Sequence, residues 1–218
     1  MAVQCRGATP GDQEARILVD CYPVSVMEDL DLKRIGQFTA TDSNGLTHSL
    51  DETWSKGPAI VVFLRHFGCL FCREQSAEFR EHEAALARDG ISVTYVSTGS
   101  VRAAQSFKRK MRLTGAVWVD PERELYQAFG FRRSVWALLR PTTWWNGLRA
   151  LIRGFRQGAT RGDPWQNGGV LVARPDGTIA FLFKSKGPGD KPQTDKVISV
   201  ARKLRPSGQL QPRPVAMV

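Results

Sequence analysis

The sequence predicts an α/β fold in which helices flank a mixed β-sheet. Ala59–Leu64 is an uninterrupted apolar run, rich in β-branched residues, of the length that a fully buried central strand needs. Two cysteines in a C-x-x-C pattern, Cys69 and Cys72, follow after a short break and open a helical pattern. Further strand and helix patterns alternate along the chain, which is the order expected for a sheet covered by helices.

The remaining elements follow from local signals. Asn44-Gly45 is a strong hairpin turn within 36–50, Ser100 is an N-cap, and Gly130 ends a helix. Strands are expected at 38–42, 46–50, 59–64, 91–96, 117–119, 170–174 and 178–183. Helices are expected from the cysteine pair to Arg88 and over 101–112, 122–129 and 194–204, with a short turn or helix at 51–54. The first two strands form an N-terminal β-hairpin, and the last two form another around Pro175-Asp176-Gly177.

One domain accounts for most of the 218 residues. We assign residues 28–205 to it, residues 1–27 to an N-terminal extension and residues 206–218 to a Pro-rich C-terminal tail. Cys5 and Cys21 lie in the extension, and neither has a neighbour that would activate a thiol. No internal repeat is visible in the sequence.

The composition is that of an ordinary globular protein, with 42% hydrophobic and 24% charged residues. No run of about 18 apolar residues occurs, so no membrane-spanning helix is expected. The N-terminus has no apolar core flanked by small residues, so no secretory signal is expected, and the thiols are expected to be kept reduced. These features predict a cytoplasmic protein.

The C-x-x-C pair is the strongest indication of chemistry in the sequence. Amide N–H groups in the first turn of a helix, and the positive end of its dipole, favour a thiolate over a thiol and so lower a cysteine pKa. Two cysteines at this spacing can also close into a reversible disulfide. The alternatives are half of a zinc site and a pair of structural thiols. A zinc site needs further ligands, and the remaining Cys and His residues form no second C-x-x-C or H-x-x-x-H pattern: Cys5, Cys21, His48, His66 and His82.

Several motifs resemble those of one family. The most specific is Phe63-Leu-Arg-His-Phe-Gly-Cys-Leu-Phe-Cys-Arg73; the others are Ile35–Phe38 with Asp42 and Gly45, Gly57-Pro58, Val119–Pro121 with Tyr126–Gly130, and Gly168–Val172 with Pro175–Gly177. Over about residues 33–205 the chain is similar to the peroxiredoxin-like branch of the AhpC/TSA superfamily, and within it to the peroxiredoxin-like 2 and prostamide/prostaglandin F synthase group. The resemblance implies a thioredoxin-like fold, a hairpin of the peroxiredoxin type, and thiol-based reduction of a peroxide, an endoperoxide or a disulfide.

The resemblance implies two alternative assignments for the cysteines. In the peroxiredoxin register, Cys72 stands where the peroxide-attacking sulfur lies and Cys69 stands where a hydroxyl orients the peroxide. By analogy with thioredoxin, Cys69 is instead the exposed attacking thiol and Cys72 is the buried resolving one. The sequence leaves both assignments open. The peroxiredoxin arginine of a later strand falls on Gly168, so it has no counterpart at that position.

Three neighbouring residues are candidates for supporting roles. Arg65 or Arg73 can supply a positive charge in place of that arginine, or both can be solvated residues of the loop and the helix. His66 can lower a thiol pKa or shuttle a proton if its ring faces the sulfurs, or it can point at solvent. The candidate catalytic residues are therefore Cys69, Cys72, His66, Arg65 and Arg73.

A basic insert at residues 131–167 lies between the helix expected at 122–129 and the second hairpin. The formal net charge is +10, and residues 131–162 contribute seven arginines with no Asp or Glu. Apolar residues recur on one helical face: Trp144, Trp145, Leu148, Leu151, Ile152 and Phe155. Three interpretations stay open: a helix packed on the domain, a lid that adds an apolar and cationic wall for a hydrophobic acidic substrate, and a helix that lies on an anionic membrane. Nucleic acid is not an expected partner, because no recognised binding motif accompanies the charge.

The functional hypothesis is an antioxidant enzyme, a thiol-dependent oxidoreductase. A thiolate attacks an O–O or S–S bond of a small hydrophobic or peroxide substrate, the Cys69–Cys72 disulfide closes, and an external thioredoxin-like dithiol reopens it. No cofactor is expected, because the sequence has no metal, flavin or Gly-rich dinucleotide pattern. The alternatives are a redox-responsive binding protein, whose insert docks on an anionic membrane or a protein partner, and a scaffold whose cysteines never pair.

Overall fold

The computed structural model describes residues 32–133, 152, 154 and 158–205. The N-terminal extension, the C-terminal tail and almost all of the helix expected within the insert lie outside these residues, so those expectations stay predictions. Among the described helices, none is long and apolar enough to cross a lipid bilayer.

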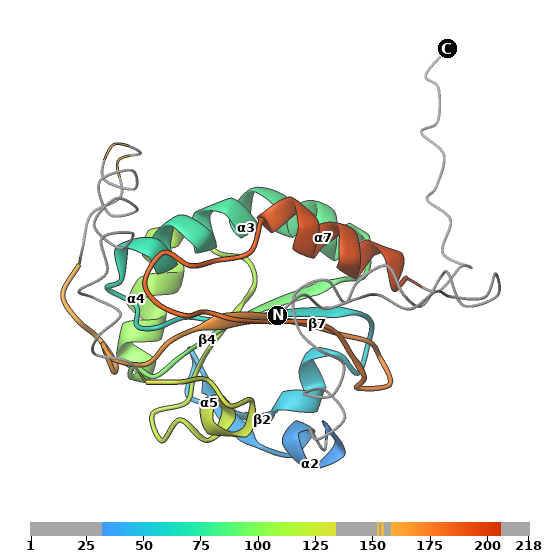
Figure 1. Ribbon diagram of the computed structural model, residues 1–218, viewed down its shortest axis with the longest axis horizontal. Coiled ribbons are helices and arrows are strands. Elements are labelled where there is room, and N and C mark those ends of the chain that lie inside the picture. Colours follow the sequence, from blue (N-terminus) through green and yellow to red (C-terminus); the bar gives the residue numbers. More distant parts are fainter. Residues whose placement is uncertain (1–31, 134–151, 153, 155–157, 206–218) are drawn as a thin grey trace, which may run out of the picture.

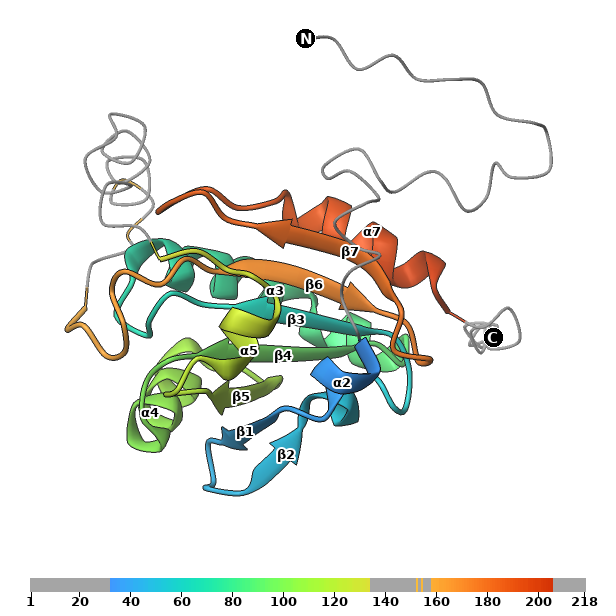
Figure 2. The same cartoon turned by 60° about the horizontal axis from the view of Figure 1, so that its bottom comes forward.

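The described residues form one seven-stranded mixed sheet in the order β2-β1-β5-β4-β3-β6-β7 (Figures 1 and 2). The strands are β1 (Thr39–Asp42), β2 (Thr47–Ser49), β3 (Ala59–Phe63), β4 (Ser92–Ser97), β5 (Ala116–Val119), β6 (Gly169–Ala173) and β7 (Ile179–Lys184). β3 and β5 both run parallel to β4, whereas all the other neighbouring strands are antiparallel. The predicted α/β class with a mixed sheet is confirmed.

Helices cover both faces of this sheet (Figure 1). They are α2 (Leu32–Gly36), the 3-10 helix η1 (Leu50–Thr53), α3 (Leu70–Arg88), α4 (Val101–Met111), α5 (Glu124–Ala128) and α7 (Thr194–Lys203). The long helices α3, α4 and α7 pack on one face, and α2, η1 and α5 pack on the other, so the core has two halves. Strand β3 serves both: Ile60 and Val62 face the first half, while Val61 and Phe63 face the second. All five of its residues are buried, which is why its sequence is continuously apolar instead of alternating.

Local signals in the sequence correspond to the observed ends of elements. The Ser100 hydroxyl accepts a hydrogen bond from Ala103 N–H at the start of α4, as an N-cap does. Gly45, in the turn between β1 and β2, has a φ of 92°, a conformation that glycine adopts without strain. Strand and helix bounds agree with the expected ranges to within about two residues, the usual scatter of element ends. The short helix α2 was not predicted.

The topology brings the ends of β3 and β4 and helix α5 together at one end of the sheet. Because β3 and β4 are parallel, their carboxyl ends meet there, and the loop that carries the first cysteine leaves from the end of β3. The buried Tyr126, just after the start of α5, ties this edge together: its hydroxyl lies 2.7 Å from Leu64 O and 2.9 Å from Val96 O. The start of the cysteine loop is thereby held against the neighbouring strand.

Replacing Tyr126 with Phe tests this anchor. The variant removes the hydroxyl donor from a buried carbonyl, so we expect the free energy of unfolding to fall by about 1–2 kcal/mol with the fold retained. Urea denaturation, followed by circular dichroism, measures the change. An unfolding free energy equal to that of the wild type would show that the hydroxyl does not hold the loop.

Candidate active site

The two cysteines lie at the start of α3. Cys69 is the N-cap residue of this helix, with extended backbone angles, and Cys72 lies in its first turn. Both are unbridged thiols, and both are buried, with exposed fractions of 2% for Cys69 and 5% for Cys72. A strand, a short loop and a cysteine pair opening a helix therefore occur in the order that the sequence predicts.

The two thiols differ in acidity because they share a hydrogen bond. The Cys72 thiol donates to the Cys69 sulfur, and this bond is the largest influence that lowers the pKa of Cys69 to about 6. Burial opposes the change, whereas the positive charge of Arg65 and the backbone N–H groups of Cys72 and Phe71 reinforce it. The same hydrogen bond, together with burial and the charge on Cys69, raises the pKa of Cys72. The surroundings of the pair therefore favour ionisation of Cys69 over ionisation of Cys72.

Arg65 contacts both sulfurs. Its backbone N–H donates to Cys72 Sγ at 3.3 Å, and its guanidinium Nη1 lies 4.0 Å from Cys69 Sγ. The side chain is buried, and two backbone carbonyls orient it: Nε donates to Gln166 O at 3.3 Å, and Nη2 donates to Pro164 O. The interpretation of Arg65 as a solvated loop residue is therefore wrong. It is a buried cation placed at the thiolate.

The other two candidates are placed differently. Arg73 extends from α3 toward Gly158. If Gly158 carried a Cβ, that atom would lie 3.7 Å from the guanidinium carbon of Arg73. His66 is buried, so the interpretation of a ring pointing at solvent is wrong. Burial and the charge of Arg65 lower the pKa of His66 to about 4. Its ring is neutral at pH 7 and supplies no positive charge to lower a thiol pKa.

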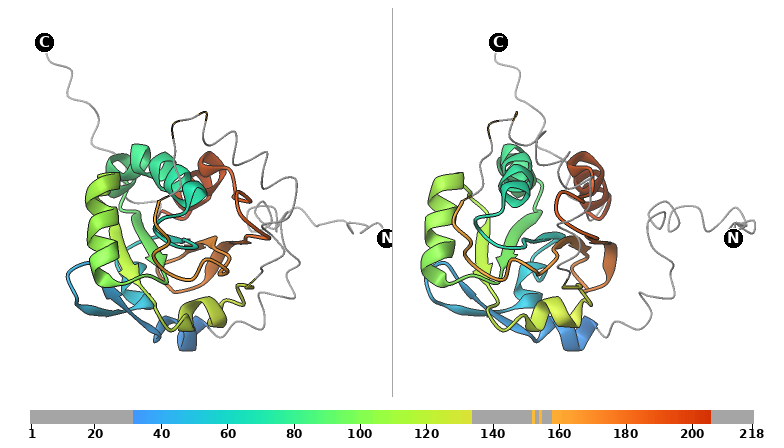
Figure 3. Two further views of the ribbon diagram at one scale, coloured as in Figure 1. Left: turned by 90° about the vertical axis from the view of Figure 1, so that its left-hand side faces the viewer. Right: turned by 60° about the vertical axis from the view of Figure 1, so that its left-hand side comes forward.

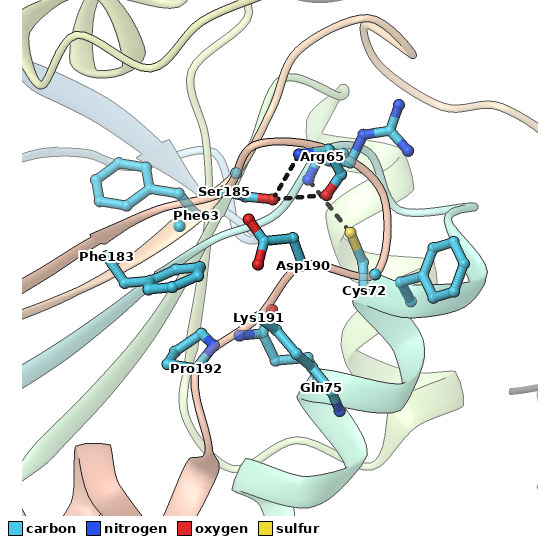
Figure 4. Close-up of a pocket in the computed structure, with 14 residues that line it drawn as sticks. Phe63, Arg65, Cys72, Gln75, Phe183, Ser185, Asp190, Lys191 and Pro192 are labelled. Atoms are coloured by element: carbon cyan, nitrogen blue, oxygen red, sulfur yellow. Dashed lines mark hydrogen bonds between the residues drawn. The ribbon is translucent and has the colours of Figure 1, made fainter. Parts of the chain in front are cut away.

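A small cavity lies beside Cys72 (Figure 4). Its volume is about 30 Å³, which is room for one or two molecules the size of water. Phe63 and Arg65 line it from the end of β3, and the segment 185–192 closes the opposite side. The Arg65 N–H bond to Cys72 Sγ, drawn dashed in Figure 4, spans its edge. Cys69 is not among the residues that line this cavity.

Gly168 explains why the arginine of the peroxiredoxin pattern has no counterpart here. A Cβ at this position would lie 2.1 Å from Phe63 O, closer than any side chain can approach a backbone oxygen. The close approach of the chain before β6 to the end of β3 therefore admits only glycine at position 168. The positive charge near the two sulfurs comes instead from Arg65, in the loop that follows β3.

Sequence reasoning missed a set of residues that position Arg65 and its loop. The backbone carbonyls of Pro164 and Gln166 accept hydrogen bonds from the Arg65 guanidinium, and neither residue type indicates such a contact in the sequence. Asp163 forms ion pairs with Arg123 at 2.7 Å and Arg133 at 2.9 Å. Its position as the first acidic residue after the arginine-rich stretch 131–162 was the available signal.

Metal binding has no prepared site in the part of the chain that the structure describes. There, no three His, Cys, Asp or Glu side chains gather in a way that could hold an ion.

The fold and the cysteine pair together define a thioredoxin-like redox protein. Among solved structures, peroxidoxin BcpB from Mycobacterium tuberculosis matches with a TM-score of 0.58 and 19% identity, over 78% of this chain and 94% of that chain. Peroxiredoxin Q of Xanthomonas campestris matches with a TM-score of 0.56 and 14% identity, over 79% of this chain and 92% of that one. The predicted thioredoxin-like architecture is confirmed.

The family is shown by a model described as AhpC/TSA antioxidant enzyme, which matches residues 78–187, half of the chain. The chain belongs to the AhpC/TSA family. It is similar to the thioredoxin-like protein AAED1, chloroplastic, of Arabidopsis thaliana, at 29% identity over 72% of this chain and 67% of that protein. It is also similar to the prostamide/prostaglandin F synthase of Salmo salar, at 27% identity over 75% and 84%, and to peroxiredoxin-like 2C of Bos taurus, at 25% identity over 76% and 77%.

Replacing Arg65 with Gln tests the charge at the thiolate. Because the guanidinium favours the ionised form of Cys69, we expect the pKa of Cys69 to rise from about 6 toward the ordinary range of a thiol. In the wild type, the alkylation rate of Cys69 should increase as the pH rises through about 6 and then level off, since only the thiolate reacts. In the variant the same increase should occur at higher pH.

The matched control for this measurement is Arg73→Gln, which removes an equal charge from the adjacent turn of α3. Iodoacetamide labelling, followed by mass spectrometry over a range of pH, gives both profiles. A larger displacement of the profile by Arg73→Gln than by Arg65→Gln would contradict the assignment of the cation.

Proposed function

We propose that this protein is a thiol oxidoreductase in which Cys69 is the attacking sulfur and Cys72 the resolving one. The observation that carries the proposal is the environment of Cys69: its sulfur lies 4.0 Å from the buried Arg65 guanidinium at the start of α3. The Cys72 side chain and this charge lower the pKa of Cys69 to about 6. A thiolate is the nucleophilic form of cysteine, and this environment maintains it at neutral pH. The arrangement supports the thioredoxin-like assignment of roles over the peroxiredoxin register.

The reaction with a hydroperoxide follows from these roles. The Cys69 thiolate attacks the terminal oxygen of the peroxide, the O–O bond breaks, and the alkoxide leaves and takes a proton. Cys69 becomes a sulfenic acid. The Cys72 sulfur then attacks Cys69 Sγ, its proton and the sulfenic hydroxyl leave together as water, and the disulfide closes. Two electrons pass from the dithiol to the substrate.

Other substrates of the same class use the same two steps. With an endoperoxide, the ring oxygen that Cys69 attacks stays on its sulfur until Cys72 displaces it, so two hydroxyl groups result. With a disulfide, Cys69 forms a mixed disulfide that Cys72 resolves. Similarity to prostamide/prostaglandin F synthases and to peroxiredoxin-like 2 proteins supports a peroxide, endoperoxide or disulfide substrate.

A thioredoxin-like dithiol completes the cycle in this proposal. Its thiolate attacks the Cys69–Cys72 disulfide, a mixed disulfide forms, and its second thiol releases the reduced pair. Docking of residues 131–162 on an anionic membrane, the second function expected from the sequence, concerns a segment that is mostly outside the described residues. It stays a prediction, as do the cytoplasmic location and the absence of a nucleic-acid partner.

Single replacement of either cysteine should abolish catalysis. We expect Cys69→Ser and Cys72→Ser each to reduce turnover of a hydroperoxide or a disulfide to background, because the cycle needs both sulfurs. A coupled assay, in which thioredoxin and its reductase supply electrons from NADPH, measures the rate. After one equivalent of peroxide, Cys72→Ser should also accumulate a sulfenic acid on Cys69, which a dimedone probe traps.

Cys5→Ser and Cys21→Ser are the matched controls and should retain wild-type turnover. Unchanged rates in Cys69→Ser and Cys72→Ser would refute the proposed function. A trapped sulfenic acid on Cys72 in the Cys69→Ser variant, with a normal single-turnover rate, would reverse the roles of the two sulfurs.

A further inference from the structure

Residues 158–166, the end of the insert, lie across the cysteine loop; we refer to this segment as the strap. It contacts the loop through the backbone: Phe67 N–H donates to Arg161 O at 3.2 Å, and Gly158 N–H donates to Gly68 O at 2.9 Å. Figure 3, which shows the side of the molecule where α3 begins, places this orange segment beside the start of that helix. The strap therefore covers the residues that immediately precede Cys69.

Glycines make the approach of the two backbones as close as it is. A Cβ at Gly68 would lie 2.1 Å from Ala159 O, so the loop admits the strap only because residue 68 has no side chain. Gly162 has a φ of 122°, and a Cβ there would lie 2.6 Å from Thr98 Oγ1. The strap thus packs without side chains against the cysteine loop at Gly68 and against Thr98 at Gly162, which a chain merely resting on the surface does not require.

The carboxyl-terminal half of the strap is fastened by charges. Asp163 Oδ2 pairs with Arg123 from the start of α5 and with Arg133, and Asp163 N–H donates to Thr98 Oγ1 at 2.7 Å. Although burial raises the pKa of Asp163, the Trp165 N–H and the two arginines hold that pKa below its usual value. Asp163 is thus ionised at neutral pH and attached to two elements of the domain.

Cys69 has almost no open surface through which a reagent could reach its sulfur. That residue is 2% exposed, and the cavity of about 30 Å³ at the pair is lined by Cys72 alone of the two cysteines. An attacking sulfur needs an approach path for its substrate, and a partner protein that reduces the disulfide needs more room than a peroxide does. The strap carbonyls of Pro164 and Gln166 also bind the Arg65 guanidinium. The same guanidinium therefore contacts both the strap and the Cys69 sulfur.

We propose that the strap is a gate over Cys69 that must lift before bulky substrates or a partner dithiol can reach this sulfur, and that Asp163 fastens it. This inference rests on the proposed function, in which Cys69 attacks. Asp163 is a positioning residue in it: the carboxylate acts through the strap and does not touch the sulfur. Substrate size is selected by how readily the fastening opens.

Alkylation of Cys69 by two reagents of different size tests the gate. The protein carries Cys5→Ser, Cys21→Ser and Cys72→Ser, so that Cys69 is the one thiol, and serine keeps a hydroxyl that can donate to it. Iodoacetamide is the small reagent, and a maleimide on a long polyethylene glycol chain is the bulky one. Rates are measured at a pH well above the pKa of Cys69, where the thiolate is complete, and each is divided by the rate of free cysteine.

In the parent protein, the bulky reagent should be slowed more than the small one. Asp163→Asn should increase the ratio of the bulky rate to the small rate by about fivefold, the effect of losing both ion pairs of Asp163. Arg133→Gln should change the ratio in the same direction by less. The matched control is Asp176→Asn, which removes a carboxylate that accepts two hydrogen bonds from Thr178 in the β6–β7 turn, and it should leave the ratio unchanged.

Hydrogen–deuterium exchange of the loop amides gives a second measurement that needs no reagent. Exchange at Phe67 should accelerate in Asp163→Asn, because the bond to Arg161 opens more often. Equal normalised rates of the two reagents in the parent, or an unaltered ratio and unaltered exchange in Asp163→Asn, would overturn the gate. Neither measurement involves turnover, so they are independent of the cysteine variants that test the proposed function.

Discussion

The site depends on holding a negative sulfur away from water. An anion is costly to bury unless neighbouring groups compensate its charge, and Cys69 is almost fully enclosed. Three sources compensate it: the thiol of Cys72, the Arg65 guanidinium, and amide groups of the first turn of α3. None of the three is enough by itself to identify a reactive cysteine, because many unreactive cysteines also lie at a helix end or near an arginine. Their convergence on one sulfur separates this cysteine pair from two structural thiols.

Arg65 links this charge to the rest of the molecule. Its backbone N–H binds one sulfur, its side chain approaches the other, and two strap carbonyls hold the guanidinium in place. In the proposed cycle, closure of the disulfide removes the charge of Cys69 and with it one contact of the Arg65 guanidinium. Burial, reinforced by the same cation, lowers the pKa of the neighbouring His66 to about 4, so this imidazole supplies no positive charge at neutral pH.

The framework of the sheet constrains which residues can form the site. The residue before β6 approaches the end of β3 so closely that position 168 must be glycine, so no side chain at that position can supply the cation. The chain shares the thioredoxin-like fold of peroxidoxin BcpB and peroxiredoxin Q and belongs to the AhpC/TSA family. The cation beside its sulfurs, Arg65, comes from the loop between β3 and α3.

The sequence by itself determined the α/β class, nearly every described strand and helix, and the two cysteines that open α3, because these depend on periodicity, capping and turn residues that are local in the chain. It left the order of the sulfurs and the state of Arg65 and His66 undecided. Those depend on burial and on partners about a hundred residues away: the carbonyls of Pro164 and Gln166 reach Arg65 only after the insert returns to the domain. Only the tertiary structure shows that Arg65 and His66 are buried and that the strap lies across the cysteine loop, since both follow from contacts between distant segments that no local pattern records.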